Sequence, residues 1–255
     1  MDPLDSRFLP LKPNPEARIR LFCFPFAGGG AGPYRTWARG LPADVDVCPV
    51  QLPGRENRLR EPAYTDAPRL LAKLGEVLAP CMDIPFAFFG HSMGGLLSFE
   101  LARRLRQQGR PEPTHIFLAA VLPPERLVQV PPIHHLPDEA FIKALSVRYD
   151  GMPAEVLQNA ELLKLYLPVL RADLTLLDTY TYTPEEPLTC PISAFGGAKD
   201  WAVGQEDIAA WRAHTTGPFR MRIFPGGHFF LNEDRLLLLQ ALAHDLARCT
   251  PTGQP

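Results

Sequence analysis

The chain has 255 residues, of which 46% are hydrophobic and 21% are charged. This length and composition predict one α/β domain over residues 1–255 with a sizeable core. The formal net charge of -2 gives no reason to expect nucleic acid or a membrane surface as the main partner, so any charged docking would be local.

The five cysteines are widely spaced and include no Cys-x-x-Cys pair. This pattern predicts neither a disulfide framework nor a zinc site, and it fits a reducing cytoplasm. The first 15 residues are polar and contain proline, so we expect no secretory signal. No apolar stretch is long enough to span a bilayer.

Apolar runs in the first part of the chain predict buried strands, and the periodic segments between them predict helices. The first strand ends at the glycine-rich loop Pro25-Phe-Ala-Gly-Gly-Gly30, and a loop dense in both charges follows the second strand over residues 53–62. We expect, in order, strands over 18–24 and 45–52, helices over 34–41 and 66–79, and a strand over 85–89.

The stretch Phe86-Ala-Phe-Phe-Gly-His-Ser-Met-Gly-Gly95 joins this last strand to a helix over 96–108, which Gly109 closes. Within it, Gly90-His-Ser-Met-Gly94 fits G-x-S-x-G, in which a serine sits on a strained strand-to-helix turn between residues that must lack bulk. A five-residue pattern also recurs by chance as an ordinary glycine-rich turn. The strand before it and the helix after it favour a nucleophile elbow.

The alternation of strands and helices continues with a strand over 115–122 and then breaks. Helices interrupted by prolines are expected over 138–147, 154–158 and 160–180, with Asp138 as a helix cap. The segment from about 123 to 187 is therefore either a helical lid or part of the outer helical layer. Long insertions in such folds tend to lie over the active site, which favours a lid.

The last part of the chain returns to the α/β pattern. We expect strands over 191–195 and 219–224, helices over 205–214 and 234–248, and a frayed tail over 250–255. Strands that are near-continuous apolar runs between helices predict a mainly parallel sheet covered on both faces.

A serine hydroxyl needs a base to take its proton and an acid to orient that base. In α/β-hydrolases these follow the serine in the order Asp or Glu, then His, and Ser92, Asp200 and His228 have this order. Each follows the end of a predicted strand, at the edge of the sheet where ligand sites form. We therefore predict this fold and this triad, and we expect His91 to shape the elbow rather than to abstract a proton.

The oxyanion hole should use the backbone N–H groups of Met93 and of Ala27 in the glycine-rich loop. The three consecutive glycines of that loop match neither a dinucleotide motif nor a Walker A motif. The alternative interpretation of the loop is a flexible turn.

Six motifs in the chain resemble, in the same order, the signatures of the type II thioesterases, the stand-alone enzymes that accompany polyketide synthases and nonribosomal peptide synthetases. They are Cys23-Phe-Pro-Phe-Ala-Gly-Gly29, Gln51-Leu-Pro-Gly-Arg-Glu56 with Arg58, Leu59 and Glu61, Gly90-His-Ser-Met-Gly-Gly95, Leu170-Arg-Ala-Asp173, Gly196-Gly-Ala-Lys-Asp200 and Gly227-His-Phe-Phe230. The resemblance covers nearly the whole chain and shows no departure at a catalytic position.

The resemblance implies hydrolysis of acyl thioesters held on the phosphopantetheine arm of an acyl- or peptidyl-carrier protein, which removes stalled or mis-primed acyl groups from the assembly line. It implies no metal or bound cofactor, and we expect a monomer. Two alternatives remain: a carboxylesterase or lipase that uses the same triad on oxoesters, and a non-catalytic carrier-binding module.

Carrier proteins are commonly acidic, so Arg55, Arg58 and Arg60 are candidates for a docking rim. The alternative is a solvated loop whose arginines are tied internally to Glu56 and Glu61.

Overall fold

The computed structural model describes residues 7–9, 14–149 and 160–249. Its six strands form one parallel sheet in the order β2-β1-β3-β4-β5-β6, which confirms the expected fold class. The strands are β1 (Ile19–Phe24), β2 (Val45–Pro49), β3 (Phe86–His91), β4 (His115–Ala119), β5 (Ile192–Gly197) and β6 (Phe219–Phe224). The strand order reverses between β1 and β3, so a crevice for a ligand is expected at their carboxyl ends.

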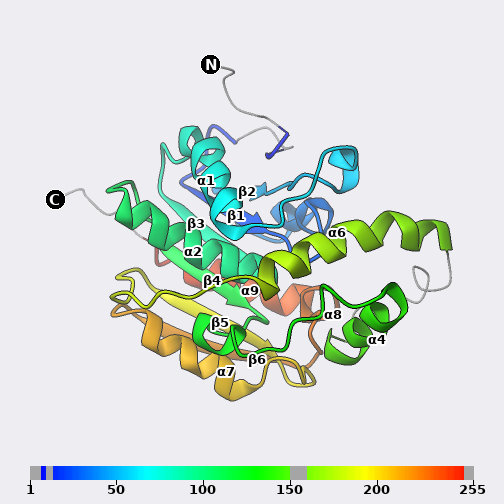
Figure 1. Ribbon diagram of the computed structural model, residues 1–255. Helices are drawn as coiled ribbons and strands as arrows, with labels where there is room; N and C mark the ends of the chain where they lie inside the picture. Colours follow the sequence, from blue (N-terminus) through cyan, green and yellow to red (C-terminus); the bar gives the residue numbers. More distant parts are fainter. Residues whose placement is uncertain (1–6, 10–13, 150–159, 250–255) are drawn as a thin grey trace.

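Helices cover both faces of the sheet (Figure 1). Alternate side chains of β1 enter different cores, because Phe22 and Phe24 join one apolar cluster while Leu21 and Cys23 join the other. The first cluster includes α1 (Ala67–Leu78), α2 (Met93–Gln107) and α7 (Gln205–Ala210), and the second includes the 3-10 helices Gly32–Tyr34 and Trp37–Arg39 with α8 (Phe230–Glu233) and α9 (Arg235–Leu246).

Several predicted boundaries were wrong for local reasons. The helix expected over 34–41 is two 3-10 helices, in which a spacing of three residues buries both Tyr34 and Trp37. The strand expected to reach residue 52 ends at Pro49, which has no N–H for the ladder. The helix expected to end at 214 becomes a 3-10 helix at Trp211–His214.

The helix after the elbow starts three residues earlier than expected, at Met93, so Ser92 itself occupies the cap position. Its predicted end is confirmed, since Gly109 has φ +61° and the amide of Arg110 donates to the carbonyl of Leu105. Asp66 caps α1 by accepting a hydrogen bond from the Arg69 amide.

The predicted insertion holds three described helices, α3 (Pro124–Leu127), α4 (Asp138–Tyr149) and α6 (Ala160–Asp178). Figure 1 shows α4 and α6 together beside the sheet. Asp138 is the first residue of α4 rather than a residue before it, and its carboxylate accepts a hydrogen bond from Arg171. The expected helix over 154–158 and the expected tail over 250–255 lie outside the described residues.

The elbow depends on close packing of backbone around Ser92, whose φ is +52°. A Cβ atom at Gly90 would lie 2.1 Å from the carbonyl oxygen of Gly94, and one at Gly94 would lie 2.2 Å from that of Phe24. Because backbone cannot give way as a flexible side chain can, both positions require glycine.

A buried polar cluster lies at the opposite edge of the sheet, where β4 and β5 begin. Ser193 Oγ lies 2.9 Å from His115 Nε2 and donates to Asp245 at 2.8 Å, and Arg222 donates to both oxygens of Asp245. Burial lowers the pKa of His115 to about 4. Burial alone would raise the pKa of Asp245, but hydrogen bonds from Arg222 and Ser193 bring it below its usual value.

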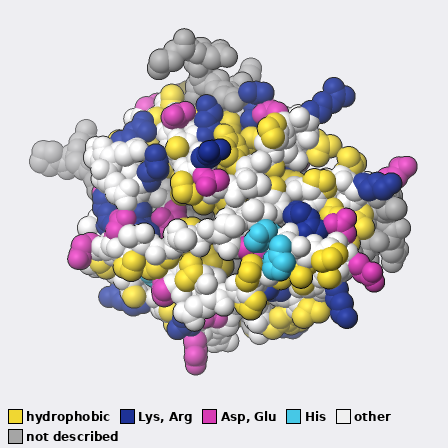
Figure 2. All heavy atoms as spheres, viewed as in Figure 1, with side chains coloured by type: hydrophobic (Ala, Val, Ile, Leu, Met, Phe, Trp, Pro, Cys, Tyr) yellow, Lys and Arg dark blue, Asp and Glu magenta, His cyan; other side chains and the backbone are white. Residues whose placement is uncertain are grey.

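The surface is chemically mixed. Figure 2 shows apolar and charged side chains interspersed over the face that is seen in Figure 1. None of the helices in the described ranges has both the length and the apolar character needed to cross a membrane.

The glycine at the elbow gives a first prediction. Gly94→Ala should lower the free energy of unfolding by about 2 kcal/mol or more, as overpacking does. Gly75→Ala is the matched control in α1, because the nearest atom to its added Cβ is 3.8 Å away, and it should stabilise by about 0.5–1 kcal/mol. Urea unfolding measures both values, and equal effects would contradict the packing argument.

The buried imidazole of His115 gives a second prediction. Its pKa is lower in the folded chain, so its stabilising contribution is complete above about pH 6.5 and is lost as the pH falls toward 4. Between pH 6.5 and 5, the free energy of unfolding of His115→Gln should fall by about 1–2 kcal/mol less than that of the unmodified chain. The exposed His244→Gln is the control, and a parallel fall in all three proteins would show that His115 does not contribute.

Candidate active site

The structure brings the three predicted triad residues together at the carboxyl edge of the sheet. His228 Nε2 lies 3.2 Å from Ser92 Oγ, and His228 Nδ1 lies 2.8 Å from Asp200 Oδ2. Each residue lies on the loop after a different strand, β3, β5 or β6. The end of β5 and the loop after β6 can approach closely because Gly197 has no Cβ, which would lie 2.2 Å from the carbonyl oxygen of Gly227.

Asp200 is held in one orientation by its own loop. Its Oδ1 accepts hydrogen bonds from the amides of Ala202 and Val203 at 2.9 and 3.2 Å. An ionised carboxylate only accepts hydrogen bonds, so Nδ1 of His228 donates to it and Nε2 is left to accept the Ser92 proton. The arrangement is therefore suited to general-base activation of the serine hydroxyl.

His91 contacts the backbone of the triad histidine, which agrees with the expectation that it shapes the elbow and does not abstract a proton. Its side chain is fully buried, and its Nε2 lies 2.8 Å from the carbonyl oxygen of His228. Burial, with a smaller effect of His228, lowers the pKa of His91 to about 3. A neutral imidazole that donates from Nε2 to this carbonyl orients the His228 backbone and does not reach Ser92.

The two predicted oxyanion donors flank Ser92. Met93 is the first residue of α2, and the first amides of a helix have no partner inside it. Ala27 lines a cavity together with Ser92 and His228. Within the described part of the chain, the Ala27 amide donates no hydrogen bond.

Two small cavities meet at Ser92 and His228, and Tyr149 and Leu177 line both of them. The first has a volume of about 90 Å³ and runs between α2 and the start of the insertion, with walls that include Leu96, Val121, Leu127 and Val130. The second has a volume of about 40 Å³ and reaches Ala27.

A larger groove lies outside the second cavity. It has a volume of about 400 Å³ and shares Phe26, Ala27, Leu170 and Phe229 with that cavity. The exposed side chains of Leu59, Leu165 and Tyr166 line it farther out. The site therefore combines an inner apolar space at Ser92 with an outer approach along α6.

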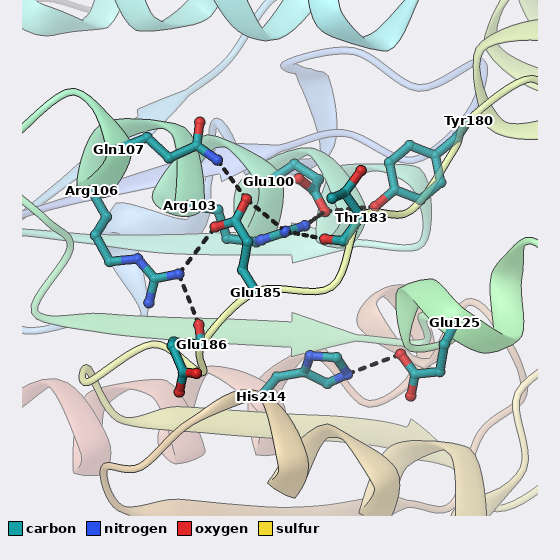
Figure 3. Close-up of polar contacts among 10 residues, drawn as sticks. All are labelled: Glu100, Arg103, Arg106, Gln107, Glu125, Tyr180, Thr183, Glu185, Glu186 and His214. Atoms are coloured by element: carbon teal, nitrogen blue, oxygen red, sulfur yellow. Dashed lines mark hydrogen bonds and ion pairs between the residues drawn. The ribbon is translucent and has the colours of Figure 1, made fainter.

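The segment after α6 is tied to α2. Figure 3 shows Arg103 between Glu100 and Glu185, with further contacts from Arg106 and Gln107 to the same segment. Arg103 lies 2.9 Å from Glu185, and Arg106 donates to the carbonyl oxygens of Glu186 and Pro187 at 2.8 Å. The end of the insertion is therefore attached to the helix that begins at the nucleophile.

The proposed docking rim was wrong for two of its three arginines. Arg55 and Arg58 are only 4% and 3% exposed, since Arg55 pairs with Asp173 and Arg58 pairs with Glu61. They are structural cations rather than surface groups, and only Arg60 is exposed. The internal ties expected as the alternative are present for Arg58.

Sequence reasoning missed two groups at the site. Tyr149 places its ring 5.2 Å from that of His228, and Asp173 accepts a hydrogen bond from the amide of Gly28. A signal existed for Asp173, because it ends Leu170-Arg-Ala-Asp173, one of the six motifs that resemble the family signatures, but has no place in the triad. No comparable signal marked Tyr149.

The cluster of Ser193, His115 and Asp245 contains the same residue types but has a different arrangement. Its carboxylate accepts the hydrogen bond of the serine hydroxyl directly, so that O–H is not directed at the histidine. All three side chains are buried at the amino edge of the sheet, away from the cavities that Ser92 lines. This geometry is that of a structural network.

Comparison with known proteins identifies the family. The thioesterase-domain family matches residues 19–248. Linear gramicidin dehydrogenase LgrE of Brevibacillus parabrevis is 45% identical over 238 residues, which cover 92% of this chain and 90% of that protein.

Two solved structures are also similar. RedJ, a thioesterase from the prodiginine biosynthetic pathway in Streptomyces coelicolor, has a TM-score of 0.82 and 40% identity, over 89% of this chain and 90% of that one. The type II thioesterase BorB from the borrelidin biosynthetic cluster has a TM-score of 0.79 and 35% identity, over 92% of this chain and 94% of that one. The chain therefore belongs to the thioesterase family and has its α/β-hydrolase fold.

Proposed function

We propose that this chain hydrolyses acyl thioesters held on the phosphopantetheine arm of acyl- or peptidyl-carrier proteins, and so removes stalled or aberrant acyl groups from a polyketide or nonribosomal peptide assembly line. The observation that carries the proposal is the Ser92–His228–Asp200 arrangement, which opens onto an inner apolar cavity and, past Ala27, onto an outer groove. The type II thioesterase BorB supports the assignment to this class.

Acylation begins when Ser92 Oγ attacks the thioester carbonyl carbon while Nε2 of His228 takes the hydroxyl proton. The amides of Ala27 and Met93 stabilise the negative charge that develops on the carbonyl oxygen. The carbon–sulfur bond then breaks, and the carrier thiol leaves with the proton from His228. Asp200 stabilises the imidazolium that forms between these steps.

Deacylation repeats the same proton transfers with water. Nε2 of His228 takes a proton from water as the oxygen attacks the acyl carbon of the Ser92 ester. Collapse of the tetrahedral intermediate releases the free acid and returns the proton to Ser92 Oγ. No metal or cofactor takes part in this mechanism.

The cavities suggest where each part of the substrate lies. The arm of a carrier is long and thin, which suits the outer groove along α6, and its thiol end would reach Ser92 past Ala27. The acyl group would then enter the apolar cavity beside Leu96 and Val121. The acyl group would thus lie in the inner cavity while the carrier remains outside.

The remaining expectations belong to the same proposal. We propose that the protein acts as a monomer in the cytoplasm, with carrier proteins as its partners and without binding nucleic acid or membranes. The net charge of -2 and the mixed face in Figure 2 support carrier binding through a small local patch rather than through one large charged face. The five cysteines are free and buried, in keeping with a reducing compartment.

The triad alone does not choose the leaving group, so two other functions are compared with this one. A carboxylesterase or lipase would prefer an oxoester, whereas a carrier-binding module would hydrolyse neither substrate. The dehydrogenase name of LgrE suggests a third, but the loop at Gly28–Gly30 lacks the spacing of a dinucleotide motif.

Replacing the nucleophile tests the proposal. Ser92→Ala should lower the rate of acyl-carrier hydrolysis by about 10⁴-fold or more, because the covalent path is lost. Ser98→Ala, in the same helix, should keep the activity. Mass spectrometry of loaded carriers measures both rates, and circular dichroism confirms folding.

The substrate comparison decides between the functions. An acyl-carrier thioester and a p-nitrophenyl ester of the same acyl group are offered to the unmodified protein. Faster turnover of the oxoester would support the esterase, and no turnover of either would support the binding module.

A further inference from the structure

Residues 25–32, here called the oxyanion loop, are held from outside by four side chains. Asp173 accepts a hydrogen bond from the Gly28 amide at 2.7 Å. The other contacts are from the Ala31 amide to Gln51 at 2.8 Å, from the Gly32 amide to Glu56 at 2.9 Å and from Arg55 to the Gly29 carbonyl oxygen at 3.2 Å.

Asp173 differs from the other three because it comes from α6, and it forms a buried ion pair with one of them, Arg55. Its two oxygens accept from Nη1 and Nη2 of Arg55 at 2.7 and 2.9 Å, and the two side chains are 2% and 4% exposed. Such a pair often adds no net stability over an apolar pair of similar volume, because two charges must leave water. Net stability therefore gives no reason for this pair, whereas its effect on the geometry of the loop does.

The contact lies one peptide from the proposed oxyanion donor. Asp173 fixes the peptide group between Ala27 and Gly28, and Gly28 has φ +76°, a conformation that few other residues adopt. A Cβ at Gly28 would also lie 2.6 Å from Leu170 on α6. The Ala27 N–H belongs to the preceding peptide, whose Phe26 carbonyl accepts a hydrogen bond from the Gly29 amide at 2.9 Å. The turn at Ala27 is thus held by the loop on one side and by the insertion on the other.

We propose that Asp173 is a positioning residue, which directs the Ala27 N–H toward the oxyanion by binding the Gly28 amide while Arg55 holds its carboxylate in place. The proposal rests on the proposed function, since it assigns a task to the same oxyanion hole. Asp173 lies four residues before Leu177 and three after Leu170, so one face of α6 both lines the cavities and sets the hole.

Two double variants, both without the charges of the Arg55–Asp173 pair, isolate the effect of the oxygen that accepts from Gly28. Arg55→Met with Asp173→Asn removes both charges but keeps an oxygen that can accept from Gly28. Arg55→Met with Asp173→Leu removes the oxygen as well. With an acyl N-acetylcysteamine thioester, kcat of the leucine variant should be about 10- to 100-fold lower than that of the asparagine variant, with KM within about threefold, because small misplacements of catalytic groups have effects of this size.

Hydrogen exchange gives a readout that needs no substrate. Exchange of the amides in residues 25–32 should be faster in the leucine variant than in the asparagine variant. Asp245→Asn is the control, because Asp245 is an equally buried acid paired with arginine but lies at the other edge of the sheet. It should change neither exchange in the loop nor kcat beyond about threefold.

The outcomes separate this proposal from the proposed function. Equal kcat and equal loop exchange in the two double variants would overturn the positioning role. If the unmodified protein hydrolyses no thioester but the exchange difference is present, only the proposed function fails. Should the leucine variant not fold, Arg55→Met with Asp173→Ala takes its place: it also lacks the acceptor for Gly28, so a kcat equal to that of the asparagine variant would contradict the proposal.

Discussion

The positive φ of Ser92 is the constraint on which the rest of the structure depends. This conformation is unfavourable for serine by itself, and it persists because β3, α2 and the end of β1 enclose the turn without side chains in between. The hydroxyl is thereby raised above the sheet edge, where His228 can reach it. Ala120, after the neighbouring strand β4, also has positive φ, and it borders the larger of the two cavities that Ser92 lines.

The machinery around Ser92 is assembled from segments that lie far apart in the sequence. The acid and the base come from the loops after β5 and β6, while the oxyanion loop follows β1. The acid and the base have partners that fix their direction: the amides of Ala202 and Val203 bind Asp200, and Asp200 binds His228. Few groups would have to reorient as charge develops, which is the condition for strong electrostatic stabilisation.

Local patterns were sufficient to predict the sheet and the position of Ser92, Asp200 and His228 after strand ends, because a strand end and its loop lie together in the sequence. Arg55 and Asp173 were beyond such patterns. They are 118 residues apart, and charged residues in a polar loop and on a helix are usually solvated. Only tertiary packing brings them together and buries them. The two 3-10 helices were missed for a related reason, since burial of Tyr34 and Trp37 decides their shape.

The attachment of the insertion to α2 has a consequence for the shape of the cavities. Glu185 and its neighbours are bound to the helix that carries Ser92 at its start, so the chain just after α6 shares a common frame with the nucleophile. Leu177, near the end of α6, lines both cavities from this side. This wall of the site is therefore tied to the helix that begins at the nucleophile, and we expect substrates of different length to be accommodated at the other walls.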